Sequence, residues 1–300
     1  MVMCNFISYV KVLQKPVFLL RASMLTLFLL GCGDDQWNLE VLNKTNPLHP
    51  YRIQKIDLNG SVSMEMIWAS AGSFIMGSPE TEKGRQTGRE EEHEVVLKKG
   101  FFLGKYEVTQ LQYLAVMQGG KAKINENPSQ FTGSDLPVEK VSWIDAQLFI
   151  KRLNLYASKL KMLPFGWQFS LPTESEWEYA CRAGTKTTYS WGNTIRETDT
   201  NWASPNGTRQ TRKVGSYDPN PWGFYDMHGN VREWVNDWYA EEYPVGRAED
   251  PQGPEEGAYR VARGGSWNDT PSFLRSADRQ NGSPDARYHA LGFRVCLKKG

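Results

Sequence analysis

Three stretches between residues 109 and 184 carry the start signals and hydrophobic spacing of helices. Each begins with a Ser or Thr followed three residues later by an acid or an amide: Thr109 with Gln112, Ser142 with Asp145, and Thr173 with Glu176. In such a capping box the first side chain accepts from a free backbone N–H while the second reaches back to the first residue's amide. We therefore expect three helices. The third should end near Gly184, because glycine readily adopts the left-handed conformation that closes a helix.

The middle helix also shows a hydrophobic stripe. Its apolar residues recur at intervals of about three to four, the spacing of one helix face. We expect this stripe to pack against the rest of the protein. Its members are Ile144, Leu148, Phe149, Leu153 and Tyr156.

Short apolar or alternating stretches lie around these helices, at 67–76, 93–102 and 259–263, and Gly, Pro and Asn clusters separate them. Such stretches are typical of short strands joined by turns. No repeat or low-complexity linker follows residue 60. The pattern predicts one loop-rich α+β domain at 61–300, with few helices and short strands.

The composition agrees with a fold rich in turns and large aromatic side chains. The 300-residue chain has 27 Gly, 11 Trp and 13 Tyr, and aromatic rings of this size supply much of a core's buried area. The 35 Lys and Arg residues nearly balance 34 Asp and Glu residues, so no overall field attracts nucleic acid, which we do not expect as a partner. Four cysteines without a CxxC pair predict neither a zinc ribbon nor a thioredoxin-like site.

The first thirty-two residues resemble a bacterial lipoprotein export signal. Lys11, Lys15 and Arg21 precede an apolar run at 22–31 that is too short to span a bilayer. The run ends in Leu-Leu-Gly-Cys, which resembles a lipobox with Cys32 as the lipidated residue. We expect a signal peptide at 1–31, a polar tether at 32–60 and a lipid anchor in the cell envelope, at the outer membrane or cell surface. The alternative is an uncleaved hydrophobic anchor with Cys32 as an ordinary thiol.

Seven motifs, read in order, resemble the sulfatase-modifying-factor family, whose type member is the formylglycine-generating enzyme. The resemblance covers residues 63 to 298 and implies a variant of the C-type-lectin fold. Fold alone does not fix function, because the family includes oxidases, maturation enzymes and ligand-binding lipoproteins. The motifs begin at the residue given: AGSFIMGS at 71, KYEVT at 105, LPV at 136 with VSW at 141, LPTESEWE at 171, WGFYDMHGNVREW at 222, RGGSW at 263 and LGFRV at 291.

The resemblance also shows what is missing. The family's oxidase converts a sulfatase cysteine to formylglycine and holds copper(I) with two cysteines after the Gly-Gly-Ser motif. Aligned on the 275–279 sequence RSADR, those positions are Ser276 and Pro271, and no cysteine lies between Cys181 and Cys296. Copper(I) needs soft thiolate ligands, so we do not expect copper, and Ser276 has no neighbour in sequence that marks it as a nucleophile.

Two further features follow from the resemblance. The vertebrate oxidase joins a cysteine on the LPTESEWE helix to one just after the GFR strand, which implies a disulfide between Cys181 and Cys296. Cys296 lies one residue later than the family pattern, and on a strand that offset reverses the side-chain face. The second feature is a structural calcium ion, held by Asp226, Gly229, Val231 and Glu233, with a weaker second site at Asn201 and Asn206. The alternative is that these motifs only set turns.

Three hypotheses for function remain. The first is a non-catalytic ligand-binding or assembly module that uses the segment after the RGGSW motif at 263–267, called here the C-terminal segment. Its mixture of aromatic, amide and charged side chains suits recognition of an extracytoplasmic protein or glycan. The second is an oxidase or maturation enzyme acting on sulfatase or siderophore-pathway substrates. The third is a partner in a secretion or motility complex. The residues expected to bind ligand in the first hypothesis are Trp267, Asn268, Asp269, Phe273, Arg275, Ser276, Asn281 and Tyr288.

Overall fold

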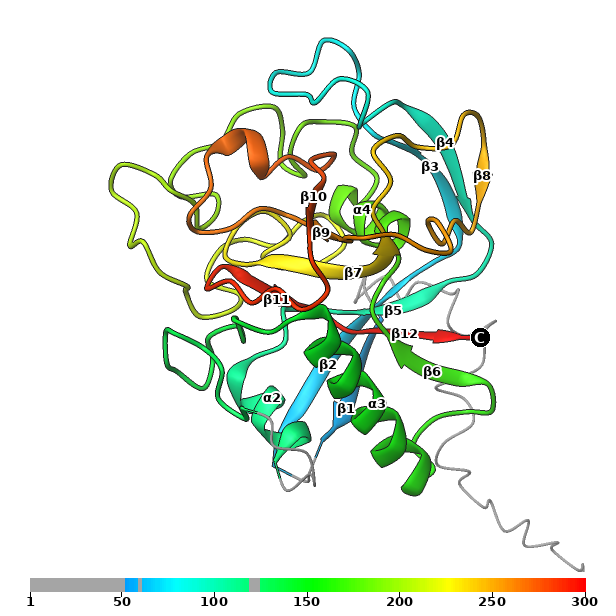
Figure 1. The fold of residues 1–300 in the computed structure, drawn as a ribbon, viewed down its shortest axis with the longest axis vertical. Helices are drawn as coiled ribbons and strands as arrows, with labels where there is room; N and C mark the ends of the chain where they lie inside the picture. Colours follow the sequence, from blue (N-terminus) through cyan, green and yellow to red (C-terminus); the bar gives the residue numbers. More distant parts are fainter. Residues whose placement is uncertain (1–51, 59–60, 119–124) are drawn as a thin grey trace, which may run out of the picture.

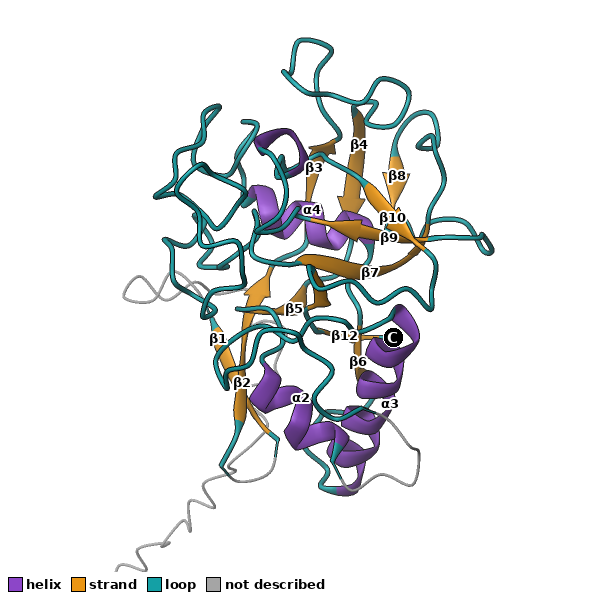
Figure 2. Ribbon diagram, turned by 60° about the vertical axis from the view of Figure 1, so that its left-hand side comes forward, coloured by secondary structure: helices purple, strands orange, loops and turns teal. Residues whose placement is uncertain are grey.

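A computed structural model describes residues 52–58, 61–118 and 125–300. The described chain forms an α+β fold with short elements and long connecting loops (Figures 1 and 2). The predicted signal peptide, Cys32 and most of the predicted tether lie outside the described residues. Within the described part of the chain, no helix combines the length and apolarity needed to cross a membrane.

A five-stranded antiparallel sheet lies in the lower half of the molecule in Figure 1. Its strand order is β1 (Ile53–Asp57), β2 (Ser63–Ala69), β5 (Phe101–Gly104), β12 (Cys296–Lys299) and β6 (Trp167–Ser170). Strand β1 pairs along its whole length with β2. The predicted tether at 32–60 is therefore wrong at its C-terminal end. The polar residues that made this segment look unstructured are the exposed positions of an edge strand.

Two smaller sheets lie in the upper half. One has the order β10 (Gln280–Gly282), β9 (Arg260–Arg263), β7 (Arg232–Trp238) and β11 (Leu291–Phe293). The other joins β3 (Gly72–Met76), β4 (His93–Leu97) and β8 (Ala248–Glu249). The predicted stretches 67–76 and 93–102 each contain parts of two strands, because the chain turns between β2 and β3 and between β4 and β5. The third stretch, 259–263, is confirmed as β9.

All three capping boxes are confirmed. They start α2 (Gln110–Met117), α3 (Trp143–Lys159) and α4 (Glu174–Arg182), with both reciprocal hydrogen bonds present in each. Helix α4 ends as predicted, with Ala183 at φ 49° and Gly184 at φ 86°, both in the left-handed region. A short 3-10 turn, η2 (Pro271–Phe273), lies in the C-terminal segment.

The predicted stripe of α3 is only partly correct. Phe149 and Leu153 are buried, but Ile144 is 53% exposed and Leu148 is half-buried. The buried face instead uses Ala146 and Ala157, whose small side chains let the helix approach its neighbours closely. The large apolar residues alone therefore predicted a stripe rotated from the true one.

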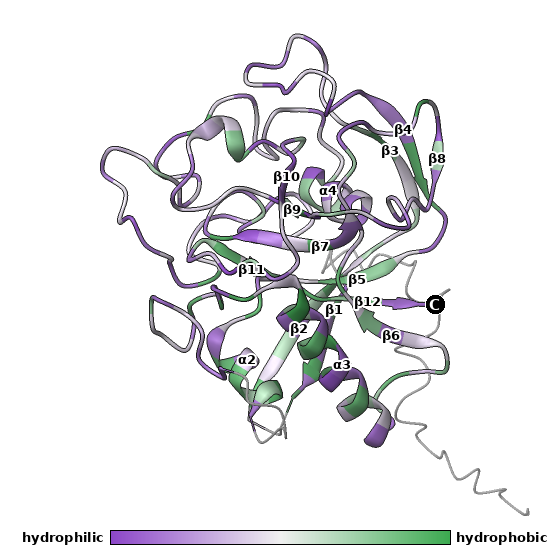
Figure 3. Cartoon of the chain, in the orientation of Figure 1, coloured by the Kyte–Doolittle hydropathy of each residue, from purple (hydrophilic) through white to green (hydrophobic). Residues whose placement is uncertain are grey.

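Two hydrophobic clusters form the core. One fills the space between the five-stranded sheet, α2 and α3, and the other lies around α4 and β3–β5. Strands β5 and β11 are hydrophobic along their length, whereas β10 is hydrophilic (Figure 3). The hydrophilic strand β10 therefore lies at the edge of the four-stranded sheet.

Candidate functional site

The position that we expect to match the oxidase's copper-binding thiol lies in the interior. Ser276 has 0% of its surface exposed, and its hydroxyl lies against the buried Cys181 thiol. Its backbone N–H donates to the Thr188 carbonyl at 2.8 Å, which fixes the segment in place. Pro271, at the other thiol position, begins η2. Neither side chain offers a thiolate, so the donor set for copper(I) is absent from these positions.

His228 and Cys181 are buried in contact with one another, with Cys181 Sγ 3.5 Å from His228 Nε2. The Ser190 N–H donates to His228 Nε2 at 3.1 Å, so the ring proton lies on Nδ1, 2.7 Å from the Leu274 carbonyl. Burial lowers the pKa of His228 to about 4 and raises the pKa of Cys181 to about 12. Both groups are neutral at pH 7, which suits packing and not acid–base or thiolate chemistry.

The predicted disulfide is not formed in the structure. Cys181 and Cys296 are both free and buried. Cys181 Sγ contacts His228, whereas Cys296 Sγ lies 3.9 Å from Glu176 Oε2. The two sulfurs therefore have different partners, and burial also raises the pKa of Cys296.

The structure divides the eight residues predicted to bind ligand into two groups. Four are buried and hold the segment together: Trp267, Asp269, Arg275 and Ser276. Trp267 Nε1 donates to the His289 carbonyl, and Asp269 pairs with Arg232. Arg275 pairs with Glu82 and Glu90, and Ser276 is enclosed. The prediction that these four face a ligand is wrong, because intramolecular partners already occupy their polar groups or the fold encloses them. The other four are exposed: Asn268, Phe273, Asn281 and Tyr288.

Phe273 and Asn281 line an open groove of about 440 Å³. Asn268 and Tyr288 do not line it. The groove also includes residues that were not predicted, from the loop between β3 and β4 and from β10. We call it the C-terminal groove; its lining is Gly84, Gln86, Arg89, Ser272, Phe273, Asp278, Arg279, Gln280 and Asn281.

The predicted calcium loop forms a tight turn, with φ 57° at Asp226, 101° at Gly229 and 61° at Asn230. A Cβ on Gly229 would lie 2.3 Å from the Asn201 carbonyl oxygen, so this close approach requires glycine. Asp226 is buried, and its Oδ2 accepts from the Gly215 N–H at 2.7 Å. Burial raises the pKa of Asp226 to about 6 and the pKa of the neighbouring Glu107 well above its usual value. A bound cation would stabilise the ionised form of these two buried carboxyls.

Glu233 is not available as a calcium ligand. Its carboxylate accepts from Arg294 Nε and Nη2, each at 2.6 Å, and from Trp177 Nε1 at 2.7 Å. Asn201 lies against the loop and donates to Asn230 Oδ1 at 3.2 Å. Asn206 is exposed and bonds to Glu197, away from this loop. The described residues contain no group of three or more His, Cys, Asp or Glu placed to hold a metal.

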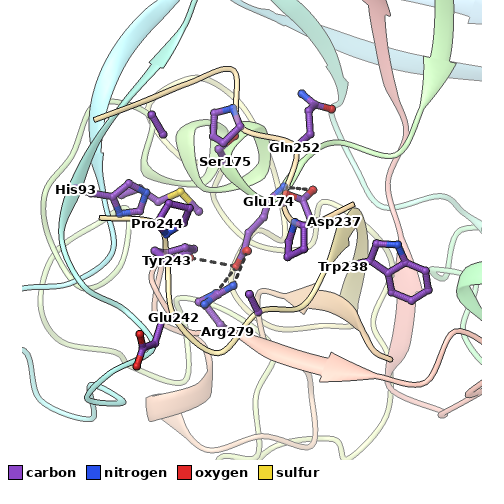
Figure 4. A pocket seen from close by; sticks show the side chains of 16 residues that line it. His93, Glu174, Ser175, Asp237, Trp238, Glu242, Tyr243, Pro244, Gln252 and Arg279 are labelled. Carbon is purple, nitrogen blue, oxygen red and sulfur yellow. Dashed lines mark hydrogen bonds and ion pairs between the residues drawn. The ribbon is translucent and has the colours of Figure 1, made fainter. Parts of the chain in front are cut away.

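A cavity of about 320 Å³ lies beside the first turn of α4 (Figure 4). The end of β7 contributes Asp237 and Trp238, and the following loop contributes Tyr243 and Pro244. Glu174 lies at its centre in Figure 4, bonded to Arg279 Nε and Nη2 at 2.7 and 2.9 Å and to the Tyr243 hydroxyl at 3.1 Å. Arg279 also lines the C-terminal groove. The cavity and the groove are therefore neighbours.

Sequence reasoning missed this cavity. The one available signal was Asp237, an acid that follows the buried positions Trp234 and Val235 of β7 and is itself buried. A charged residue at an inward position of a strand indicates either an ion pair or a site. The segment 239–257, which includes β8 and completes the cavity, has no recognisable motif.

Comparison with known families supports the fold. A model of the sulfatase-modifying factor enzyme 1-like domain matches residues 57–299. The solved structure of variable protein 1 from Treponema denticola is similar, with a TM-score of 0.70, 29% identity and coverage of 81% of this chain and 98% of that protein.

Two curated relatives are similar in sequence. The chaperone protein LppX of Paenibacillus barcinonensis is 31% identical over 255 residues, which cover 70% of this chain and 80% of LppX. The serine/threonine-protein kinase pkn1 of Chlamydia caviae is 33% identical over 259 residues, covering 78% of this chain and 38% of the kinase. The match thus spans about two fifths of that kinase's length.

Proposed function

Because the chain belongs to the sulfatase-modifying factor enzyme 1-like domain family, we propose that it is a non-catalytic member that binds a protein ligand through its C-terminal groove and the adjoining cavity. One observation carries the proposal. Ser276, which the alignment of the RSADR sequence places at the family's copper-binding thiol, is fully enclosed, and no cysteine lies between Cys181 and Cys296 in the sequence. Without that thiol pair the family's oxidase chemistry has no ligands for its metal.

The surface supports binding in two ways. Arg275 and Arg279 hold the segment rigidly through buried ion pairs with Glu90 and Glu174. A rigid frame that presents Phe273 and Asn281 loses little conformational entropy when a ligand binds. The names of two similar proteins, a chaperone and a variable protein, are also compatible with a role in binding.

A crosslinking experiment tests this function. The full chain is expressed with its export segment, crosslinked in intact cells and recovered, and the crosslinked protein is identified by mass spectrometry. Replacing Phe273 and Asn281 together by Ala should abolish capture of a protein that the wild type captures. Phe165→Ala is the matched control, because Phe165 is 99% exposed in the loop between α3 and β6 and lies outside the groove. Equal capture by the groove variant, or oxidation of a Cys-x-Pro-x-Arg peptide, would contradict the proposal.

The location in the cell is a second part of the proposal. We propose that Cys32 carries a lipid and that the domain is displayed in the envelope, at the outer membrane or cell surface. The support comes from the sequence at 22–32 and from Gly33, the uncharged residue directly after the cysteine. Removing the anchor should release the domain without unfolding it, because β1 and all the other described strands and helices follow Cys32 in the chain.

Calcium is the third part. We propose a structural calcium ion at the 226–231 loop, with the Asp226 carboxylate and the backbone carbonyls of Gly229 and Val231 as ligands. The buried and incompletely neutralised carboxyls of Asp226 and Glu107 support it. Glu233 is left out of the set because Arg294 already neutralises it. Such an ion would stabilise the folded loop and would take no part in chemistry.

A further inference from the structure

The cavity beside α4 has apolar walls and one carboxyl, that of Asp237, which forms no ion pair with the basic side chains of the described residues. Its rim residues Glu242, Pro244, Gln252 and Pro254 are exposed, so the cavity opens to solvent. Asp237 lines its interior and is only 4% exposed. The apolar part of the cavity wall is formed by Met76, Trp238, Ala240, Tyr243, Pro244, Ala248, Pro251 and Pro254.

Asp237 differs from the carboxylates around it. Glu174 is paired with Arg279 at 2.7 Å, and Glu176 with Lys298 at 2.7 Å. Asp237 Oδ2 accepts from the Glu174 N–H at 2.9 Å, and no ion pair joins Asp237 to a Lys, Arg or His of the described residues. Burial of an acid beside other acids is costly unless a cation or a proton neutralises it. Accordingly, desolvation and the charge of Glu174 raise the pKa of Asp237 to about 8.

The nearby cations bond to other groups, and Lys298 and Arg260 act on Asp237 only through their charge. Arg279 uses its guanidinium for Glu174 and for the carbonyls of Arg89 and Glu241. Both oxygens of Glu176 accept from Lys298 Nζ. Arg260 is stacked between Trp143 and Trp238 with its Cζ 3.8 and 3.4 Å from the ring centroids. The charged or titratable groups around Asp237 are thus Glu174 and Glu176 of α4, Lys298 of β12, Arg260 of β9, His93 of β4, and Glu242, Tyr243 and Arg279 along the cavity wall.

From these observations we propose that the cavity binds a primary amine on an apolar stem, with the Asp237 carboxylate accepting from the ammonium group. The apolar walls would pack against the methylene groups, as surfaces do around a lysine stem. The Trp238 and Tyr243 rings extend this apolar wall, and each already has an arginine stacked on it, Arg260 on Trp238 and Arg279 on Tyr243. This inference rests on the proposed function. When the ligand is a protein, the primary amine is that of a lysine side chain.

A matched pair of small probes tests the site without any protein ligand. The probes are n-hexylamine and n-hexanol, which share a stem and differ in the charged head. Binding is measured by calorimetry with the full chain at pH 9, where Asp237 is ionised and the amine still carries its proton. Hexylamine should bind more tightly than hexanol. Asp237→Asn keeps the size and the hydrogen bond to Glu174 but cannot carry charge, so it should weaken hexylamine binding about ten-fold or more. Equal binding of the two probes, or unchanged binding by Asp237→Asn, overturns the proposal.

Two variants control for folding and for general charge. Glu255→Gln makes the same carboxylate-to-amide change in the segment that follows β7, at an exposed residue outside the cavity lining, and it should leave hexylamine binding unchanged. Ala240→Phe fills the cavity and should abolish binding of both probes even if Asp237→Asn proves unstable. Retained hexylamine binding by Ala240→Phe places the amine elsewhere and overturns the site.

The outcomes separate this site from the proposed function. If hexylamine binds through Asp237 but crosslinked capture is unaffected by the groove variant, the amine site stands and the proposed function fails. If capture depends on the groove but hexylamine does not bind, the amine site fails and the binding function stands.

Discussion

Arg275 and Glu90 form a bidentate ion pair in the interior, although 185 residues separate them in sequence. Arg275 Nη1 lies 2.7 Å from Glu90 Oε2, Nη2 lies 2.8 Å from Oε1, and both side chains are essentially inaccessible to solvent. The pair ties the C-terminal segment to the loop between β3 and β4. Residues of both segments line the C-terminal groove.

Removing one member of this pair should destabilise the fold strongly. Arg275→Ala leaves Glu90 buried without its partner, a situation that costs about 3–5 kcal/mol. The free energy of unfolding, measured by urea denaturation, should fall by that amount. Arg287→Ala is the control, because Arg287 is half exposed in its pair with Asp145 and should cost about 1 kcal/mol or less. Similar losses in both variants would mean that the buried pair does not anchor the segment.

Calcium should stabilise the domain through the 226–231 loop. Adding calcium to protein dialysed against a chelator should raise the Tm, since a ligand that binds only the folded state stabilises it. Asp226→Asn should remove most of that rise. Asp218→Asn, an exposed acid on the same stretch of chain, should retain it. A Tm that does not respond to calcium in the wild type would leave the loop as a turn only.

The pH dependence of stability should report on Asp237. Its folded-state pKa of about 8 lies above the value of about 4 in an unfolded chain. The folded state then holds the proton more tightly, so the contribution of Asp237 to stability is complete below about pH 4. The free energy of unfolding should fall by about 1.4 kcal/mol for each pH unit between about 4 and about 8, and this contribution should be constant above that range.

Asp237→Asn cannot ionise and should abolish this part of the pH dependence. Unfolding free energies at pH 5, 7 and 9 should fall less steeply in Asp237→Asn than in the wild type, while Glu255→Gln should parallel the wild type. Parallel curves for wild type and Asp237→Asn would show that Asp237 is ionised in the folded protein well below pH 8.

How far the sequence predicts the molecule depends on how local each signal is. The capping boxes at Thr109, Ser142 and Thr173 are signals within four residues, and all three are confirmed. The buried stripe of α3 depends on what packs against it, so Ala146 and Ala157 were overlooked beside the larger Ile144. Strand β1 was missed because only Ile56 and the following Leu58 are buried at that edge.

The site was harder to predict for the same reason. Arg275 looked like a surface residue because its partners Glu82 and Glu90 are about 190 positions away in the chain. Asp237 faces a cavity that exists only once the 239–254 loop folds over α4. The motif resemblance located the fold and the missing thiols, whereas the burial of each polar side chain required the three-dimensional structure.

The lipid anchor has a direct test in cells. Cys32→Ser should prevent labelling of the protein by a radioactive fatty acid and move it from the membrane fraction to the soluble envelope fraction. The Tm of the released protein should equal that of the wild-type domain. Continued labelling, or membrane association that survives the substitution, would favour an uncleaved hydrophobic anchor at 22–31.

The absence of oxidase chemistry is the central claim, and oxygen uptake tests it most directly. Purified protein is loaded with copper(I) and mixed with a Cys-x-Pro-x-Arg peptide, and dissolved oxygen and formylglycine are measured together. We predict no peptide-dependent oxygen consumption and no stoichiometric copper at the Ser276 position. Retained copper with turnover of the peptide would show that this chain is a catalyst and contradict its assignment as a binding module.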